Sequence, residues 1–316
     1  ALKSNSNFTL EYLKLELTKN CCPIKNIMIT KTLAQEKNKP CILCNNKKHN
    51  TILSFNQPDQ YEQAVGVENS CYFREWVRCS NCGLNRSIFS RDDDILDTIY
   101  TEAYRDKNAA WRNGSTQNVF KRVINLPFDE SETKNRIHYI KSNLKKLWDD
   151  GICNKRPLPL NLLDIGGGSA VFAYEFRDEV WEVSVVDACA SGELLEELKI
   201  PFIQDYYMPN LFENSFDLIS MVFVLEHIKN PHVILKDIYD DLDYNSFLYI
   251  EVPDSNSFEL NDEKHDVFNS CHLYIYNPKT LTLLLDECGF EVQTLNRVQT
   301  IKGYFSTMLL ATKKKA

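Results

Sequence analysis

The sequence predicts an α/β fold, with a mostly parallel sheet in the C-terminal half and a small cysteine-containing module before it. The apolar run Leu162–Ile165 is followed by three glycines and a helix-forming segment, which predicts a buried strand, a tight turn and a helix. Further apolar runs downstream end at acidic residues, and strands alternating with helices in this way build a parallel sheet. Two CxxC motifs upstream predict the separate module.

The composition is that of a soluble protein with about two domains. The chain has 316 residues, of which 43% are hydrophobic and 25% are charged. Its formal net charge of -8 argues against a nucleic-acid partner, because nucleic-acid binders usually carry a basic face. No apolar run approaches the about 18 residues of a membrane span, and Ala1–Leu10 lacks the apolar core of a secretory signal. We therefore expect a cytoplasmic protein with reduced cysteines, whose oligomeric state the sequence does not fix.

Four of the 11 cysteines have the spacing of zinc ligands. Cys41 and Cys44 form the first CxxC motif, and Cys79 and Cys82 form the second. Each pair can turn both thiolates toward one tetrahedral centre, so we expect a structural zinc ion held by four sulfurs. Gly83 follows the second pair, where a tight turn requires positive φ. Buried free cysteines and a redox pair are the alternatives, but a redox pair requires a thioredoxin-like frame that the flanking residues do not provide.

The glycine loop that begins at Gly166 lies where a strand passes into a helix, the usual place for a nucleotide cofactor. A dinucleotide fingerprint would have its third glycine where Val171 stands, so an NAD-dependent oxidoreductase is disfavoured. The next strand ends at Asp187, whose carboxylate could accept hydrogen bonds from both ribose hydroxyls, and a third segment ends at Asp205. Taken alone, Asp187 could equally be a strand-end or cap residue. The ordered series of acids favours a ligand site.

The Asp-x-Gly-x-Gly sequence formed by Asp164, Gly166 and Gly168 resembles motif I of the class I S-adenosylmethionine-dependent methyltransferases. The segments Ser215–Ile219 and Val224–Ile228 resemble the fourth strand of that family and the turn after it. The resemblance covers roughly the C-terminal half of the chain, and it implies a Rossmann-like seven-stranded domain.

The resemblance also implies that S-adenosylmethionine is the cofactor. The implied cofactor-binding residues are Asp164, Gly166, Gly168, Asp187, Asp205 and Tyr206. Asp205 would hold the adenine amino group, and Tyr206 would lie beside the adenine ring. The sequence departs from the family at Ala170, where a third glycine is common.

The order of the motifs divides the chain into four parts. We expect an N-terminal extension over residues 1–35, a zinc-ribbon module over 36–100, a helical linker over 101–130 and a class I methyltransferase domain over 131–316. Aromatic and basic linker residues, such as Tyr104 and Trp111, are expected to pack in a helix or, alternatively, to line the substrate mouth. A cysteine ribbon before motif I resembles the zinc-ribbon methyltransferases of bacterial sugar and surface-polysaccharide pathways.

Three histidines are candidate catalytic residues, because transfer to a hydroxyl needs a base near neutral pH. His227 follows the fourth strand, although a Glu-His pair at this place also serves loop structure. His265 and His272 lie in a segment after the fifth strand that resembles the family's acceptor-covering loop. A divalent cation held by Glu226, His227 and a nearby carboxylate is an open alternative.

These features predict an enzyme that transfers a methyl group from S-adenosylmethionine to a sugar hydroxyl, in a nucleotide-linked sugar or a surface glycan. The alternative acceptors are a quinone, a lipid, or a sugar carbon or amine. A non-catalytic binding protein would be expected to lose the glycine loop or Asp187, and both are present.

Overall fold

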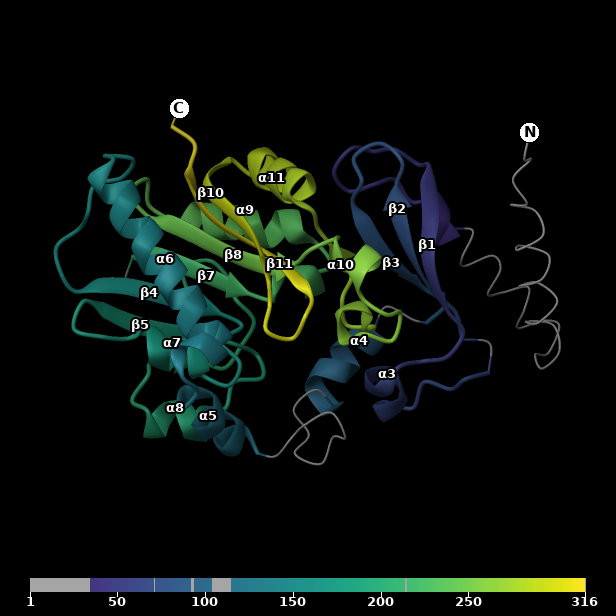
Figure 1. The fold of residues 1–316 in the computed structure, drawn as a ribbon, viewed down its shortest axis with the longest axis horizontal. Coiled ribbons are helices and arrows are strands. Elements are labelled where there is room, and N and C mark those ends of the chain that lie inside the picture. Colours follow the sequence, from purple (N-terminus) through teal and green to yellow (C-terminus); the bar gives the residue numbers. More distant parts are fainter. Residues whose placement is uncertain (1–34, 71, 92–93, 104–114, 214, 316) are drawn as a thin grey trace. The chain divides into compact units, whose positions relative to one another are not determined.

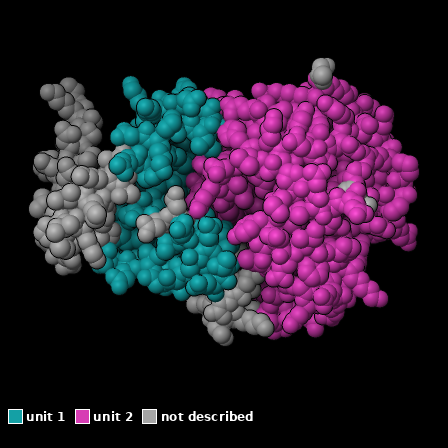
Figure 2. All heavy atoms as spheres, turned by 180° about the vertical axis from the view of Figure 1, so that it is seen from behind, with its two compact units in different colours: residues 1–104 teal, residues 105–316 magenta. Residues whose placement is uncertain are grey.

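The computed structural model describes residues 35–70, 72–91, 94–103, 115–213 and 215–315. The chain divides into two units, residues 1–104 and 105–316, which have different colours in Figure 2. The extension expected over residues 1–35 lies outside the described residues, apart from its last residue. Residues 104–114 of the expected linker, with Tyr104 and Trp111, also lie outside them.

The first unit is built on an antiparallel ribbon (Figure 1). Its elements are β1 (His49–Phe55), α3 (Gln60–Ala64), β2 (Arg74–Cys79), β3 (Asn85–Phe89), α4 (Ile95–Thr98) and the π-helical turn η1 (Ile99–Ala103). Strand β2 pairs with β1 on one side and β3 on the other, with His49 opposite Cys79 and Arg78 opposite Asn85. Trp76 of β2, Ile88 of β3 and Ile99 of η1 are fully buried.

The second unit contains a seven-stranded sheet in the order β10-β11-β8-β7-β4-β5-β6. The strands of this unit are β4 (Leu160–Ile165), β5 (Trp181–Val186), β6 (Phe202–Ile203), β7 (Leu218–Val222), β8 (Phe247–Pro253), β9 (Tyr274–Ile275), β10 (Phe290–Gln299) and β11 (Phe305–Lys313). The helices are α5 (Thr116–Ile124), η2 (Phe128–Glu130), α6 (Glu132–Asp149), α7 (Val171–Phe176), α8 (Gly192–Glu197), η3 (Leu225–His227), α9 (Pro231–Asp241), α10 (Ser257–Leu260), η4 (Asp266–Phe268) and α11 (Pro278–Glu287).

The sheet is parallel from β8 to β6, while β11 runs antiparallel to β8 and β10 antiparallel to β11. From β4 the chain moves outward to β5 and β6, then returns to β7 and β8 on the other side of β4. Ligands in such sheets bind at this switch point, above the carboxyl ends of the strands. The order confirms the predicted Rossmann-like seven-stranded fold, and from it we expect a ligand site above β4 and β7.

Helices cover both faces of the sheet because parallel crossovers are right-handed. The crossovers through α7 and α9 proceed in opposite directions along the sheet, so these helices lie on opposite faces; α6 and α7 are on the near face in Figure 1. Phe176 of α7 packs edge-on against Trp181 of β5, with ring centroids 5.2 Å apart. Helix α6 also sends Arg136 to Glu251 of β8, where the two buried side chains form an ion pair. Among the described residues, no helix combines the length and the hydrophobicity that crossing a bilayer requires.

Candidate active site

The glycine loop follows β4 directly, at the switch point of the sheet. Gly166 has a φ of 74°, and a Cβ atom there would lie 2.5 Å from Cγ2 of Val224, which follows β7. At Gly167, a Cβ atom would lie 2.7 Å from Val185 of β5 and 2.9 Å from the carboxylate of Asp164. The loop backbone therefore packs closely against its neighbours, which residues without side chains permit. The predicted sequence of strand, glycine turn and helix is present as β4, this loop and α7.

Asp187 follows β5 and reaches the glycine loop. Its Oδ2 atom accepts a hydrogen bond from the backbone of Gly168 at 2.8 Å, and its Oδ1 atom accepts one from the backbone of Cys189 at 2.6 Å. Each carboxylate oxygen has a further lone pair, so Asp187 can accept hydrogen bonds from a ligand while it holds the loop. The acid expected to bind ribose thus touches the loop expected to bind the cofactor.

Asp205 and Tyr206 follow β6 at the same edge of the sheet. Strand β6 is parallel to β5, and the backbone nitrogen of Asp187 donates to the carbonyl of Ile203 at 3.2 Å. Asp205 accepts a hydrogen bond from the backbone of Tyr206 at 2.7 Å, and Tyr206 is 59% exposed. Their expected contacts with adenine stay predictions.

Asp164 differs from the other acids because it is buried within the sheet. Its Oδ1 atom accepts a hydrogen bond from the hydroxyl of Ser220 on β7 at 2.7 Å. Burial raises the pKa of Asp164 to about 7, although the Ser220 hydrogen bond acts in the opposite direction. Because its Oδ2 atom faces Gly167, the side chain supports the loop from below. The structure gives Asp164 this position beneath the loop, and its expected part in cofactor binding stays a prediction.

Glu226, His227 and His272 form a side-chain cluster near the glycine loop. Glu226 and His227 lie on η3, immediately beyond the Val224 side chain that crowds Gly166. His272 lies in the segment between η4 and β9. This segment is hydrogen-bonded to η3, because the backbone N–H of Leu273 donates to the carbonyl of Glu226 at 2.8 Å. The two histidine rings are 4.7 Å apart, and a Glu226 oxygen lies 3.8 Å from Nε2 of His227. The structure therefore brings together two of the three predicted histidines.

Backbone carbonyls orient both rings of this cluster. Nδ1 of His227 donates to the carbonyl of Cys271 at 2.9 Å, and Nδ1 of His272 donates to that of Val267 at 2.7 Å. In the neutral form of each ring, Nε2 then carries the lone pair. Burial and the neighbouring His272 lower the pKa of His227 to about 3, so its ring is neutral. Burial also raises the pKa of Glu226, and within the described part of the chain neither of its carboxyl oxygens has a hydrogen-bond partner.

His265 makes different contacts from the other two histidines. Its Nδ1 atom accepts a hydrogen bond from the backbone of Val267 at 3.2 Å, which caps η4. Its ring packs against Tyr304, with the ring centroids 5.8 Å apart. This capping position is a local structural role, and a catalytic role for His265 stays a prediction.

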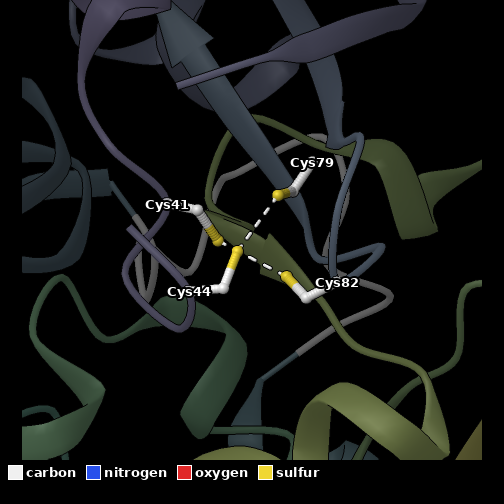
Figure 3. A group of neighbouring side chains, drawn as sticks. All are labelled: Cys41, Cys44, Cys79 and Cys82. Carbon is white, nitrogen blue, oxygen red and sulfur yellow. Dashed lines mark hydrogen bonds between the residues drawn. The ribbon is translucent and has the colours of Figure 1, made fainter. Parts of the chain in front are cut away.

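The four cysteines predicted to bind zinc converge in the first unit (Figure 3). The sulfurs of Cys41 and Cys82 are 3.5 Å apart, as are those of Cys44 and Cys79, and all four lie within 4.8 Å of one another. A tetrahedral zinc ion with Zn–S bonds of about 2.3 Å holds its sulfurs about 3.8 Å apart. The donor set and its spacing therefore fit zinc.

Two matching turns position these cysteines. The backbone of Gly83 donates to the carbonyl of Cys79 at 3.0 Å, and Gly83 has the positive φ, 85°, that the sequence predicts. The backbone of Asn45 donates in the same way to the carbonyl of Cys41 at 3.0 Å, with a φ of 54°. The CxxC spacing alone does not point to Asn45, although asparagine is one of the few residues with a side chain that readily adopt this conformation.

Comparison with known families decides the class of protein. A family profile described as a methyltransferase domain matches residues 133–295, which is about half of the chain and contains the glycine loop, Asp187 and the Glu226 cluster. The chain belongs to this family. It is an S-adenosylmethionine-dependent methyltransferase, as the Asp-x-Gly-x-Gly motif implied. No curated protein matches the chain.

Solved structures of methyltransferases resemble this methyltransferase at low identity. One is 1,6-didemethyltoxoflavin-N1-methyltransferase from Burkholderia thailandensis with bound S-adenosylhomocysteine, at 17% identity and a TM-score of 0.47 over 63% of this chain and 85% of that one. Another is magnesium protoporphyrin IX methyltransferase from Synechocystis with bound S-adenosylmethionine, at 15% identity and a TM-score of 0.44 over 69% of this chain and 97% of that one. A third is an S-adenosylmethionine-dependent methyltransferase from Clostridium acetobutylicum, at 11% identity and a TM-score of 0.45 over 63% of this chain and 99% of that one.

Proposed function

We propose that this methyltransferase transfers the methyl group to a hydroxyl of a sugar, in a nucleotide-linked sugar or a surface glycan. One observation carries the proposal. Glu226, His227 and His272 form a largely buried group of hydrogen-bonding side chains near the glycine loop. A hydroxyl must lose its proton as it is methylated, and side chains that accept hydrogen bonds beside the acceptor suit that step. The resemblance of the cysteine ribbon to sugar methyltransferases supports the same acceptor class.

The chain's own residues would divide the work between cofactor and acceptor. When bound, S-adenosylmethionine supplies a methyl group that is already electrophilic, because it is carried on a sulfonium. Gly166 and Gly168 would lie against the cofactor, and Asp187 would accept hydrogen bonds from its ribose. Asp205 and Tyr206 would contact the adenine.

The remaining work is to orient the acceptor and to take up its proton. Nε2 of His227 and of His272 would each accept a hydrogen bond from the acceptor, since both Nδ1 atoms are committed to backbone carbonyls. In the first unit, a zinc ion would be held by the four cysteines Cys41, Cys44, Cys79 and Cys82. Its role would be structural, because four thiolates leave the ion no open position.

A transfer assay with radiolabelled S-adenosylmethionine tests the acceptor class. The acceptors are nucleotide-linked sugars and oligosaccharides, with a quinone, a phospholipid and an aliphatic amine as competitors. We expect base-stable label in a sugar, and we expect His272→Gln to lower kcat at least tenfold while it retains S-adenosylhomocysteine binding. His232→Gln is the matched control, because His232 pairs at the surface with Glu287, at 2.9 Å. Label found only in the quinone, the lipid or the amine would contradict the proposal.

A further inference from the structure

We propose that Glu226, His227 and His272 form a binding site for a divalent first-row transition-metal ion, which receives the acceptor hydroxyl. The inference deepens the proposed function and rests on it for the identity of the acceptor. The ion would be separate from the zinc of the cysteine ribbon, since it uses nitrogen and oxygen donors in the second unit.

The donor set and its spacing suit such an ion. One carboxylate oxygen and one nitrogen from each of two imidazoles lie within 4.8 Å of one another, and the oxygen is 3.8 Å from Nε2 of His227. Two imidazoles and one carboxylate are a recurrent ligand set for divalent transition metals. Donors around one ion at about 2.1 Å lie roughly 3 Å apart, so the Glu226 oxygen and Nε2 of His227 would approach by about 1 Å and a donor pair at the 4.8 Å limit by about 2 Å. Small rotations of the Glu226 and histidine side chains would provide this approach.

The hydrogen bonds around the two rings are those of metal-binding histidines. A ligating histidine usually donates its other ring nitrogen to a carbonyl or a carboxylate, which fixes the tautomer and the ring plane. His227 donates in this way to Cys271, at 2.9 Å, and His272 donates to Val267, at 2.7 Å. Both rings are thereby held with Nε2 as the donor atom for a metal, and with the ion bound the acceptor oxygen would bind the ion in place of direct hydrogen bonds to the two Nε2 atoms.

Glu226 provides the second, independent observation. Its side chain is 0% exposed, and neither of its carboxyl oxygens has a hydrogen-bond partner among the described residues. A buried polar group without a partner destabilises a protein, so such a group calls for an explanation. A bound cation supplies the missing partner and compensates the charge of the carboxylate.

The partial exposure of the two histidines gives an acceptor a side from which to approach the cluster. Glu226 is 0% exposed, whereas His227 and His272 are 14% and 9% exposed. Three protein ligands leave at least one coordination position open, as in catalytic metal sites. The acceptor oxygen would take that position.

The chemistry balances without a further reactant. The ion lowers the pKa of the hydroxyl it binds, so the O–H bond breaks and the proton passes to water. The oxygen then forms a bond to the methyl carbon while the carbon–sulfur bond breaks. The electron pair of that bond stays on sulfur, which becomes a neutral thioether.

Cobalt titration of the full chain tests the site. The protein is first loaded with one equivalent of zinc, which the four thiolates of the cysteine ribbon take up first, and the zinc there resists displacement because cobalt binds more weakly. Calorimetry with Co²⁺ then counts the additional ions, and the cobalt spectrum distinguishes nitrogen and oxygen ligands from thiolates, which give strong sulfur-to-metal charge-transfer bands. Glu226→Gln and His272→Gln are the test variants, and His232→Gln is the matched control. S-adenosylhomocysteine binding is measured on every variant as a check of folding.

We expect the wild type and His232→Gln to bind one Co²⁺ ion each without thiolate bands, and both test variants to bind it at least tenfold more weakly. No cobalt binding beyond the zinc by the wild type would overturn the metal site, as would unchanged affinity in Glu226→Gln. These outcomes are independent of the proposed function. Cobalt binding without radiolabel in any sugar would support the metal site and reject the sugar acceptor. Radiolabel in a sugar without cobalt binding would support the sugar acceptor and reject the metal site.

Discussion

Replacing Gly166 with alanine tests the packing of the cofactor loop. The residue has a φ of 74°, and an added Cβ atom would lie 2.5 Å from Cγ2 of Val224. The left-handed conformation costs a residue with a side chain about 1–2 kcal/mol. Forcing an extra methyl into a packed site adds about 1–3 kcal/mol. We therefore expect Gly166→Ala to lower the free energy of unfolding by about 3 kcal/mol.

Gly151 is a matched control for this substitution. Its φ of 73° is nearly the same, but an added Cβ atom would have no other atom within 4 Å. Gly151→Ala should therefore show the backbone cost alone, about 1 kcal/mol. Adding Val224→Ala to Gly166→Ala should recover the crowding cost, and a double-mutant cycle measures that recovery as the coupling between the two sites.

Urea denaturation gives the free energies of unfolding, and calorimetry with S-adenosylhomocysteine gives the affinity. We expect Gly166→Ala to weaken binding by more than tenfold, because the loop must shift away from Val224, and Gly151→Ala to leave it unchanged. Equal effects of the two substitutions on both stability and affinity would show that the glycine loop is not closely packed at Gly166. A double variant with no recovery of stability would show that Val224 is not the obstacle.

Three further substitutions test other parts of the structure. Burial raises the pKa of Asp164 from 3.8 to about 7, so between these pH values the folded protein retains a proton that the unfolded chain loses. The free energy of unfolding should therefore fall by up to about 4 kcal/mol as the pH rises from about 4 to about 7. Urea denaturation should show that Asp164→Asn removes this fall. In a metal analysis, Cys79→Ser should lose the zinc ion of the cysteine ribbon, whereas Cys153→Ser, at a buried cysteine of the other unit, should retain it. Glu251→Gln leaves the buried Arg136 without its counter-charge and should lower stability by about 3–5 kcal/mol, and an unchanged thermal transition would contradict that structural role.

The sequence predicts most of the second unit because its signals are local. The run Leu162–Ile165 and the glycines after it specify β4 and the tight turn without reference to the rest of the chain. Strand β6 is harder to predict, since Phe202 and Ile203 alone form it, where the sequence predicts a segment that continues to Asp205. Its position at the sheet edge limits it to pairing with β5.

The candidate site divides in the same way between local and tertiary information. The spacing of Cys41 and Cys44 shows that both can face one centre, and this needs no knowledge of the fold. Ser220, which holds the Asp164 carboxyl, lies in an apolar run and gives no signal of its own. The approach of His272 to His227 depends on how the segment before β9 folds onto η3, which no local pattern encodes.

The central claim is that the glycine loop and Asp187 bind S-adenosylmethionine, and a single calorimetric experiment tests it. The full chain is titrated with S-adenosylhomocysteine and, separately, with NADH, and Asp187→Ala is titrated with S-adenosylhomocysteine. The structure predicts one site for S-adenosylhomocysteine in the wild type, no heat from NADH, and at least tenfold weaker binding by Asp187→Ala, because that carboxylate touches the loop at Gly168. Absence of S-adenosylhomocysteine binding by the wild type, or equal affinity in Asp187→Ala, would contradict the claim.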